Sequence, residues 1–295
     1  MPIYDEITQN NRNTVFLFVF FFVLVLAIGL VFGLLWGIGS GGLAIAGVLA
    51  IIYAVISYYA GTKIVLAVHG AVLADERKYL KLHNIVEGMS IAAGIPKPKV
   101  YVMQSNALNA FATGRNPKNA VICFTTGILE KLNKIELEGV TAHEMSHIKN
   151  YDIRVMTIAA VLAGVIMILS DLFLRSFLYG GNDSRNRGKA GLIMIVFGIL
   201  LALLAPLIAT VIKMSISRQR EYLADASGAM LTRYPKGLAS ALAKISGDTN
   251  QLSTASTATS HLFISNPFKK KNFLSGLFMT HPPIEERIKR LEQMS

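Results

Sequence analysis

The sequence is poor in charged residues and has almost no cysteine. Charged residues occupy 16% of its 295 positions, residues of the hydrophobic class occupy 53%, and the mean hydropathy is +0.48. A chain of this composition carries more apolar surface than one soluble core can bury, so we expect part of it to face lipid. Cys123 is the only cysteine. The chain can therefore form neither an intrachain disulfide nor a cysteine-rich metal cluster.

The basic residues also lack aromatic neighbours of the kind that RNA-binding surfaces need. The net charge is +11 and the pI about 9.7, so a partner for the positive charge has to be considered. In a membrane protein a basic excess records topology, because Lys and Arg collect on the cytoplasmic side. We therefore expect the lipid bilayer to be a partner of this chain and nucleic acid not to be one.

Long apolar segments are what the sequence has in abundance. Four of them, each 19 to 22 residues long, lie at residues 15–36, 43–61, 155–174 and 191–212. At ~1.5 Å per helical residue, each can cross ~30 Å of hydrocarbon as a helix that satisfies its own backbone hydrogen bonds. The only charge inside them is Asp171, four residues before Arg175. An intramembrane acid is a candidate functional residue, but an interfacial ion pair is the preferred interpretation.

The segments pair into two hairpins, which places both termini and both long polar regions on one side of the membrane. That side carries 25 of the 29 Lys and Arg residues, which predicts that it is cytoplasmic. The loop of the second hairpin weighs against this orientation, because it carries the other four basic residues, Arg175, Arg185, Arg187 and Lys189.

The two polar regions are predicted to combine helices with a few short strands. Helices are expected at residues 75–93, 133–150, 215–231, 235–245 and 283–292, and strands at 99–103, 109–113 and 120–124. Asn133 is the expected N-cap of the second helix, with Glu136 at the capping-box position. Residues 249–260, rich in Ser and Thr, are expected to form a mobile loop. His69 and His83 are expected at the surface or in packing, and Lys269–Lys271 against water or lipid headgroups.

A His-Glu-x-x-His pattern in the predicted helix 133–150 carries the chemistry. His143 and His147 are four residues apart, so on a helix they share a face and can bind one zinc ion. Glu144, next to the first histidine, can accept the proton of a water molecule that the metal polarises. The pattern predicts metal-assisted hydrolysis of a peptide bond, although two solvated histidines on a surface helix would have the same spacing.

A catalytic zinc site needs a third protein ligand. The candidates are Glu221, Asp225, His261 and His281. His147 precedes the third apolar segment by eight residues, and Glu221 follows the fourth by nine, so the second hairpin should bring these two residues together. Asp225, one helical turn beyond Glu221, could then accept a hydrogen bond from a ligand histidine. The alternative for Glu221 and Asp225 is a salt-bridged surface face with Arg218 and Arg220.

Three separated stretches, residues 143–150, 217–225 and 280–283, closely resemble the HtpX family of bacterial membrane metallopeptidases, relatives of the CAAX prenyl-protein endopeptidases. The resemblance implies one zinc ion bound by His143, His147 and Glu221. It makes Glu144 the catalytic base and Asp225 the residue that orients a ligand histidine. It also implies cleavage of misfolded or damaged membrane proteins in a stress response, at the cytoplasmic face of the bacterial cell membrane.

The implied fold is an integral-membrane, mainly α chain with a cytoplasmic, zincin-like α+β catalytic domain and a small sheet. Its four expected parts are a transmembrane hairpin (1–62), a first catalytic part (63–154), a second hairpin (155–212) and a second catalytic part (213–295).

Two further stretches have weaker functional interpretations. Asn109, Ala110, Phe111 and Ala112 resemble a family stretch that forms a sheet edge beside the site, where an extended substrate could pair. An ordinary edge strand would have the same sequence. His281 could steady the oxyanion of the reaction, or it could belong to a capping turn before the last helix.

Two alternatives to a broadly specific endopeptidase remain from sequence. One is a prenyl-protein peptidase with C-terminal specificity, for which four apolar segments are few. The other is a non-enzymatic membrane scaffold with a structural zinc ion, which would have no need of Glu144. The pattern leaves the substrates, the cleavage preference and the oligomeric state open.

Overall fold

The computed structural model describes residues 3–35, 37–179, 218–268 and 282–294. The helices are α1 (Ile3–Leu35), α2 (Gly41–Val68), α3 (Leu80–Ala93), α4 (Thr126–Lys131), α5 (Lys134–Lys149), α6 (Asp152–Tyr179), α8 (Arg218–Thr232), α9 (Pro235–Gly247) and α11 (Ile284–Gln293). The strands are β1 (Val72–Leu73), β2 (Lys99–Met103), β3 (Ala110–Gly114) and β4 (Ala120–Thr125), and two short 3₁₀ helices are η1 (Pro117–Asn119) and η3 (Ser260–Leu262).

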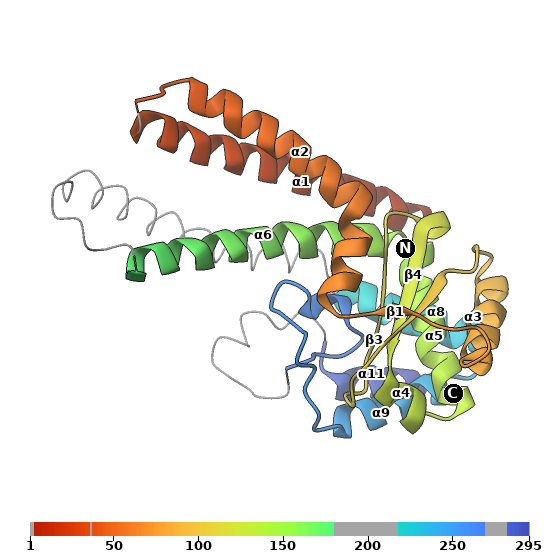
Figure 1. The fold of residues 1–295 in the computed structure, drawn as a ribbon. Helices are drawn as coiled ribbons and strands as arrows, with labels where there is room; N and C mark the ends of the chain where they lie inside the picture. Colours follow the sequence, from red (N-terminus) through yellow and green to blue (C-terminus); the bar gives the residue numbers. More distant parts are fainter. Residues whose placement is uncertain (1–2, 36, 180–217, 269–281, 295) are drawn as a thin grey trace.

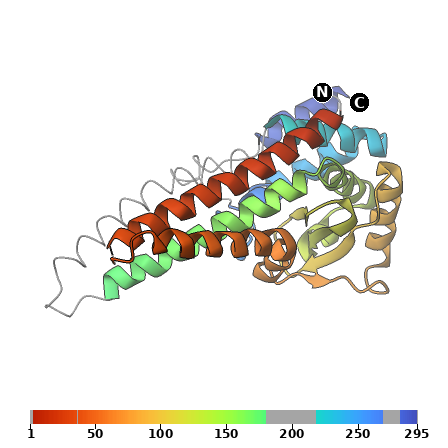
Figure 2. The ribbon, with the colours of Figure 1, turned by 90° about the horizontal axis from the view of Figure 1, so that it is seen from above.

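Three long helices extend side by side away from the part of the chain that holds the sheet (Figures 1 and 2). The backbones of α1 and α2 approach so closely in the hairpin that only glycine fits at position 42. A Cβ atom there would lie 2.3 Å from the carbonyl oxygen of Gly29. Two segments, Ile7–Leu30 and Gly41–Val68, are long and apolar enough to cross a membrane. The part Asp152–Met167 of α6 passes the same test only as a pair with α5, from which it is bent by 84°.

These helices account for three of the four predicted apolar segments. Residues 191–212 lie outside the described part of the chain, so four spans remain a prediction, as do the domain boundaries. The side chains of Asp171 and Arg175 also lie outside it, as do Lys269–Lys271.

The sheet has the order β1-β2-β4-β3 and is mixed. Strands β2 and β4 are parallel, with Val102 opposite Phe124, and the outer pairs are antiparallel. The three predicted strands are confirmed to within one residue at each end. Strand β1 was missed, because two residues are too few to show an alternating pattern.

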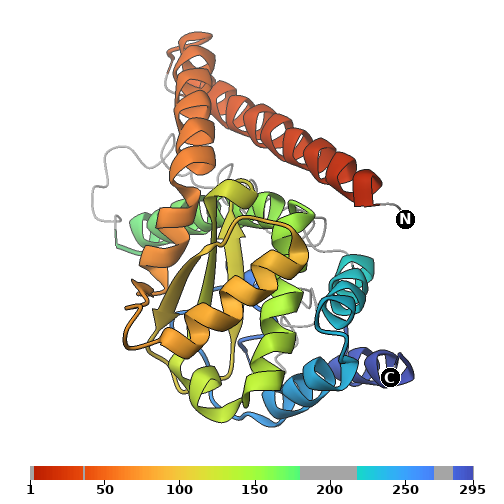
Figure 3. The same cartoon turned by 90° about the vertical axis from the view of Figure 1, so that its right-hand side faces the viewer.

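Strands β3 and β4 are buried on both faces, which explains why each is a nearly continuous apolar run. Val102, Ala112 and Phe124 face a core shared with α3, α5 and α9. The alternate residues, such as Phe111 and Cys123, face a second core formed with the end of α2 and the start of α6. Figure 3 shows α3 and α5 crossing one face of the sheet. The sheet therefore holds α5 on one side and the membrane-directed helices on the other.

Helix α5 begins where the capping pattern predicts. Asn133 Oδ1 accepts a hydrogen bond from the Glu136 backbone N–H (3.0 Å), and Glu136 Oε2 accepts one from the Asn133 N–H (2.9 Å). The buried Glu136 carboxylate is also bound by Ser240 (2.6 Å) and Lys244 (2.7 Å) of α9. The cap therefore fixes α5 against α9 as well as starting the helix.

Other local predictions need correction. The helix predicted at 75–93 begins only at Leu80, because the Asp75 carboxylate accepts two backbone hydrogen bonds, from Arg77 and Lys78, and holds a turn there. His69 and His83 are both buried, so packing is the correct one of their two predicted environments. The segment 249–259 contains no helix or strand, but Leu252 and Ala258 within it are buried.

We expect Asn133→Ala to destabilise the protein by about 1 kcal/mol. The Glu136 backbone N–H loses the side chain that accepts its hydrogen bond, and the reciprocal bond from the N–H of residue 133 to the Glu136 carboxylate loses its support. Thermal unfolding of the detergent-solubilised protein would show this as a lower midpoint. Asn84→Ala, at an exposed position of α3, is the matched control and should leave the midpoint unchanged. Equal midpoints for the two variants would contradict the role of the cap.

Candidate metal centre

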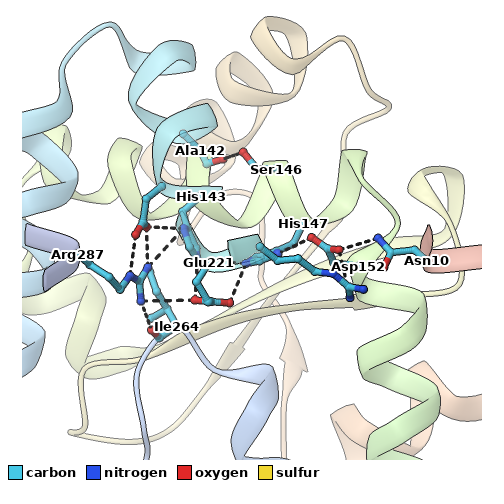
Figure 4. A network of polar contacts seen from close by, with 11 residues as sticks. Asn10, Ala142, His143, Ser146, His147, Asp152, Glu221, Ile264 and Arg287 are labelled. Atoms are coloured by element: carbon cyan, nitrogen blue, oxygen red, sulfur yellow. Dashed lines mark hydrogen bonds and ion pairs between the residues drawn. The ribbon is translucent and has the colours of Figure 1, made fainter. Parts of the chain in front are cut away.

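The His-Glu-x-x-His residues lie in the buried second half of α5. His143, Glu144 and His147 are 1%, 2% and 4% exposed. The two histidines lie on one face of the helix, and their Nε2 atoms are 3.2 Å apart. Two solvated histidines on a surface helix are therefore excluded, since the pair faces inward between α5 and α8 (Figure 4).

Glu221 of α8 completes a group of three donors. Its Oε1 lies 3.6 Å from Nε2 of His147, and its Oε2 lies 3.9 Å from Nε2 of His143. One donor atom from each of the three residues lies within 4.8 Å of the others. The two helices can approach this closely because Gly228 faces α5, where a Cβ atom would lie 3.1 Å from the backbone nitrogen of His143.

The donor set fits a zinc ion. With bonds of ~2.0–2.1 Å, the donors of a tetrahedral site lie roughly 3.3 Å apart, close to the separations of 3.2 to 3.9 Å between these three side chains. Two imidazoles and one carboxylate are also the donors that catalytic zinc sites use, with a fourth position left for water or substrate. His143, His147 and Glu221 are therefore the residues that could hold the metal.

The outer nitrogens of both histidines are occupied by carboxylates. His143 Nδ1 lies 3.0 Å from Asp225 Oδ1, and His147 Nδ1 lies 2.9 Å from Asp152 Oδ2. Asp225 is in turn held by two hydrogen bonds from Arg287 of α11, at 2.8 and 2.7 Å. With the outer nitrogens so engaged, both Nε2 atoms are directed toward Glu221 (Figure 4).

Charge supports a divalent cation at this place. Four carboxylates of the described centre are at most 3% exposed: Glu144, Asp152, Glu221 and Asp225. Two guanidinium groups, of Arg220 and Arg287, are buried among them. Among these described residues the carboxylates outnumber the guanidinium groups by two, and buried charge is costly unless it is compensated. An ion of charge +2 would offset this excess.

The pKa values describe how the centre compensates without a metal. Burial raises the pKa of Glu144 to about 7, with the charge of Glu221 adding to the rise. Burial alone would lower the pKa of His147, but Asp152 and Glu221 together raise it to about 9. The pKa of His143 is lowered, by burial first and then by Arg287 and His147, despite Asp225. The neighbouring carboxylates therefore favour the protonated form of His147 in the metal-free protein.

The structure brings only part of the candidate residues together. Glu221 joins the two histidines and Asp225 lies behind His143, so the salt-bridged surface face is excluded. His261 points elsewhere, with Nε2 2.9 Å from the Met156 carbonyl oxygen. His281 lies outside the described residues.

Sequence reasoning missed three residues of the centre, namely Asn10, Asp152 and Arg287, and considered Arg220 only as part of a surface salt bridge. Arg287 had a detectable signal, because it lies on the same helical face as the apolar Ile284, Ile288 and Leu291, where a charge needs a buried partner. The others depend on tertiary contacts.

The predicted substrate strand lies next to the base. Strand β3 is at the end of the sheet, and its backbone at Ala112 lies near enough to the Glu144 carboxylate to lower the pKa that burial raises. Its outer side already carries a segment of the same chain. Phe263 forms an antiparallel bridge with Phe111, and the Ile264 N–H donates to the Ala110 carbonyl (3.0 Å). Asn109 Nδ2 donates to the Ser265 carbonyl (3.0 Å).

Comparison with known proteins identifies the family. The profile of peptidase family M48 matches residues 76–295. Protease HtpX homologues of Caldanaerobacter subterraneus subsp. tengcongensis and Streptococcus gordonii are 49% and 44% identical to this chain, over 99% of it and over 98% and 100% of their own lengths. The chain belongs to the HtpX family of M48 peptidases.

A solved structure extends the comparison to the fold. The crystal structure of S. mikatae Ste24p is similar with a TM-score of 0.52 at 20% identity, over 90% of this chain. This chain spans 62% of that one, and the likeness concerns the fold alone. Family membership makes the chain a membrane metallopeptidase, and the His-His-Glu group is a fitting place for its metal.

We expect Glu221→Ala to lose most of its metal, because only two donors would remain. Metal analysis of the purified protein after dialysis should give clearly less than one zinc per chain. Glu138→Ala, which removes a carboxylate of α5 outside the centre, is the control and should retain the wild-type amount. An unchanged zinc content in Glu221→Ala would remove Glu221 as a ligand.

We expect zinc affinity to increase with pH. A metal ion must replace the Nε2 proton of His147, whose pKa of about 9 keeps it bound in the metal-free protein at neutral pH. Between pH 6.5 and 8.5 the apparent affinity should therefore rise about tenfold per pH unit. Chelator competition at several pH values measures this, and calorimetry in two buffers counts the released proton. A pH-independent affinity would show that His147 is neutral before metal binds.

Proposed function

We propose that this membrane metallopeptidase is a zinc-dependent endopeptidase that cleaves misfolded or damaged membrane proteins at the cytoplasmic face of the bacterial cell membrane. One zinc ion per chain would be held by His143, His147 and Glu221. The observation that carries the proposal is the position of Glu144, a buried carboxylate beside the three donors that is not one of them. A purely structural metal site has no use for such a carboxylate.

The residues around the proposed metal have separate roles in peptide hydrolysis. When bound, zinc would act as a Lewis acid that lowers the pKa of a water molecule towards ~7. Glu144, with a pKa raised to about 7, is suited to accept a proton from that water and then to deliver it to the departing amine. The backbone at Ala112 of β3 faces this carboxylate and favours its ionised form. Asp225 and Arg287 keep His143 oriented throughout.

Strand β3 is the proposed substrate-binding strand, through the backbone of residues 109–112. An extended peptide that pairs with a sheet edge is held by main-chain hydrogen bonds, which favours broad sequence tolerance. Such a peptide has to replace residues 263–265, because these now occupy the outer side of β3. Unfolded segments of other proteins are suitable substrates, since their backbone groups are free to pair. His281 remains a proposed oxyanion contact.

Three observations support the membrane substrates and the orientation. The apolar helices α1 and α2 begin or end next to the catalytic part of the chain, so the centre is close to the bilayer (Figure 1). Most basic residues lie on the proposed cytoplasmic side. Relatives that match this chain over nearly their whole length are named protease HtpX homologues.

We expect Glu144→Gln to bind zinc like the wild type and to lose proteolytic activity by 10²- to 10⁴-fold, the usual contribution of a general base. Digestion of an unprenylated, unfolded membrane protein in detergent measures this, with Glu138→Gln as the control. Equal rates for Glu144→Gln and the wild type would eliminate the general-base role and favour a structural zinc ion. Cleavage restricted to prenylated C-terminal peptides would favour the prenyl-protein alternative.

A further inference from the structure

We infer that Asp152 and Asn10 are positioning residues of the metal centre, with Asn10 supplied by the first membrane-directed helix. Asp152 orients His147 for the metal, and Asn10 fixes Asp152. This inference rests on the proposed metal-binding role of His147. It assigns to α1 a part in the centre in addition to its part in the membrane.

Asp152 reaches His147 because the chain turns sharply between α5 and α6. Helix α5 ends at Lys149 and α6 begins at Asp152, with Tyr151 in the left-handed region (φ 62°) between them. The resulting bend of 84° directs the first residue of α6 back toward α5. Asp152 Oδ2 then lies 2.9 Å from Nδ1 of His147, while Nε2 of the same ring faces the other donors. A carboxylate in this place fixes the ring orientation and the tautomer and makes the imidazole a stronger ligand.

The other oxygen of Asp152 is held from α1. Asn10 Nδ2 donates to Asp152 Oδ1 at 2.7 Å and to the Asn150 carbonyl oxygen at 2.8 Å. Both partners accept hydrogen bonds only, so the NH₂ group of Asn10 must face them. Asn10 is 1% exposed, and its own Oδ1 has no hydrogen-bond partner among the residues that the structure describes. The Asn10 side chain therefore donates to both neighbours, while its own Oδ1 accepts no hydrogen bond from a described residue.

Asp152 has a second support from α8, where Arg220 Nη1 lies 3.8 Å from Oδ1. This arrangement repeats, on His147, the arrangement that Asp225 and Arg287 form on His143. The difference is that the tighter contact comes from an amide on α1 (Figure 4). The position of His147, a proposed metal ligand, therefore depends on how α1 packs against α6.

Helix α1 packs against α6 immediately after Asn10 in the sequence. Asn10, Thr14, Leu17 and Phe21 form one buried stripe of α1 at helical spacing. Leu17 and Phe21 share a core cluster with Val155 and other residues of the first turns of α6. Asn10 is the polar end of an otherwise mostly apolar contact, so the hydrophobic packing of α1 holds the amide at Asp152.

The test measures zinc affinity in full-length protein in detergent, by competition with a chelator. We expect Asp152→Asn to bind zinc 10- to 100-fold more weakly and Asn10→Ala about 10-fold more weakly, as when partners behind a metal ligand are removed. Asn10→Asp should weaken binding at least as much, because it places an acceptor against two acceptors. Asn11→Ala is the matched control and should stay within about twofold of wild type, since Asn11 is exposed and its Oδ1 accepts from Arg154 rather than contacting Asp152.

Two further measurements separate positioning from a merely structural role. The absorption spectrum of cobalt-substituted protein should change in Asp152→Asn and Asn10→Ala but not in Asn11→Ala, because it reports ligand geometry. Thermal unfolding with and without zinc should show that these variants lose part of the stabilisation by the metal. A lower midpoint of the metal-free protein with an unchanged stabilisation by zinc would overturn the inference, because it would mean that both residues only hold the fold together.

Wild-type zinc affinity and an unchanged cobalt spectrum in all three variants would also overturn it. If Asp152→Asn does not fold, the two Asn10 variants decide the outcome. A wild-type protein that bound no zinc would overturn the proposed function and this inference with it, whereas zinc bound equally by wild type and variants would overturn this inference alone.

Discussion

The structure depends on burying several charges in one place without leaving any of them unpaired. A buried carboxylate without a partner is strongly unfavourable, and this centre contains four. Asp225 is paired with Arg287 of α11, and Asp152 of α6 with Arg220 of α8 and Asn10 of α1. Glu144 lies near the backbone of β3, and Glu221 faces both histidines of α5. Six elements, namely α1, β3, α5, α6, α8 and α11, have to meet for the centre to form.

This requirement explains why the two ends of the chain lie at the centre. Asn10 is near the beginning of the sequence and Arg287 near its end, yet they support the two histidines of one helical turn. A division of the chain into membrane parts and catalytic parts describes the hydrophobicity well. The hydrogen bonds cross this division. Asn10 of the membrane-directed helix α1 binds Asp152, which in turn binds the proposed metal ligand His147. Hydrogen bonds therefore connect the candidate metal centre to the first helix of the α1–α2 hairpin.

How much of this could be predicted from sequence depends on the range of the interaction. Helix α5 was predictable, because Asn133 and Glu136 cap it locally and His143 and His147 follow the helical period. Glu221 was predictable from sequence spacing, because the predicted second hairpin would bring it back toward the histidines. Asp152 was not, because its direction depends on the 84° bend at Tyr151, a left-handed residue that is not glycine. Residues such as Asn10 become visible only when α1 is packed against α6.

The burial of the centre sets a condition on catalysis. Glu144 is 2% exposed and the two histidines at most 4%, so a peptide cannot reach them in this conformation. The segment 263–265 makes with β3 the backbone contacts that an extended substrate would make. The Ile264 carbonyl also accepts a hydrogen bond from Arg287 (2.9 Å), the residue that holds Asp225 against His143. If a substrate pairs with β3 as proposed, it would replace Ile264 and so remove one hydrogen-bond partner of Arg287. Because Arg287 also holds Asp225 against His143, the proposed substrate strand and the metal centre share this residue.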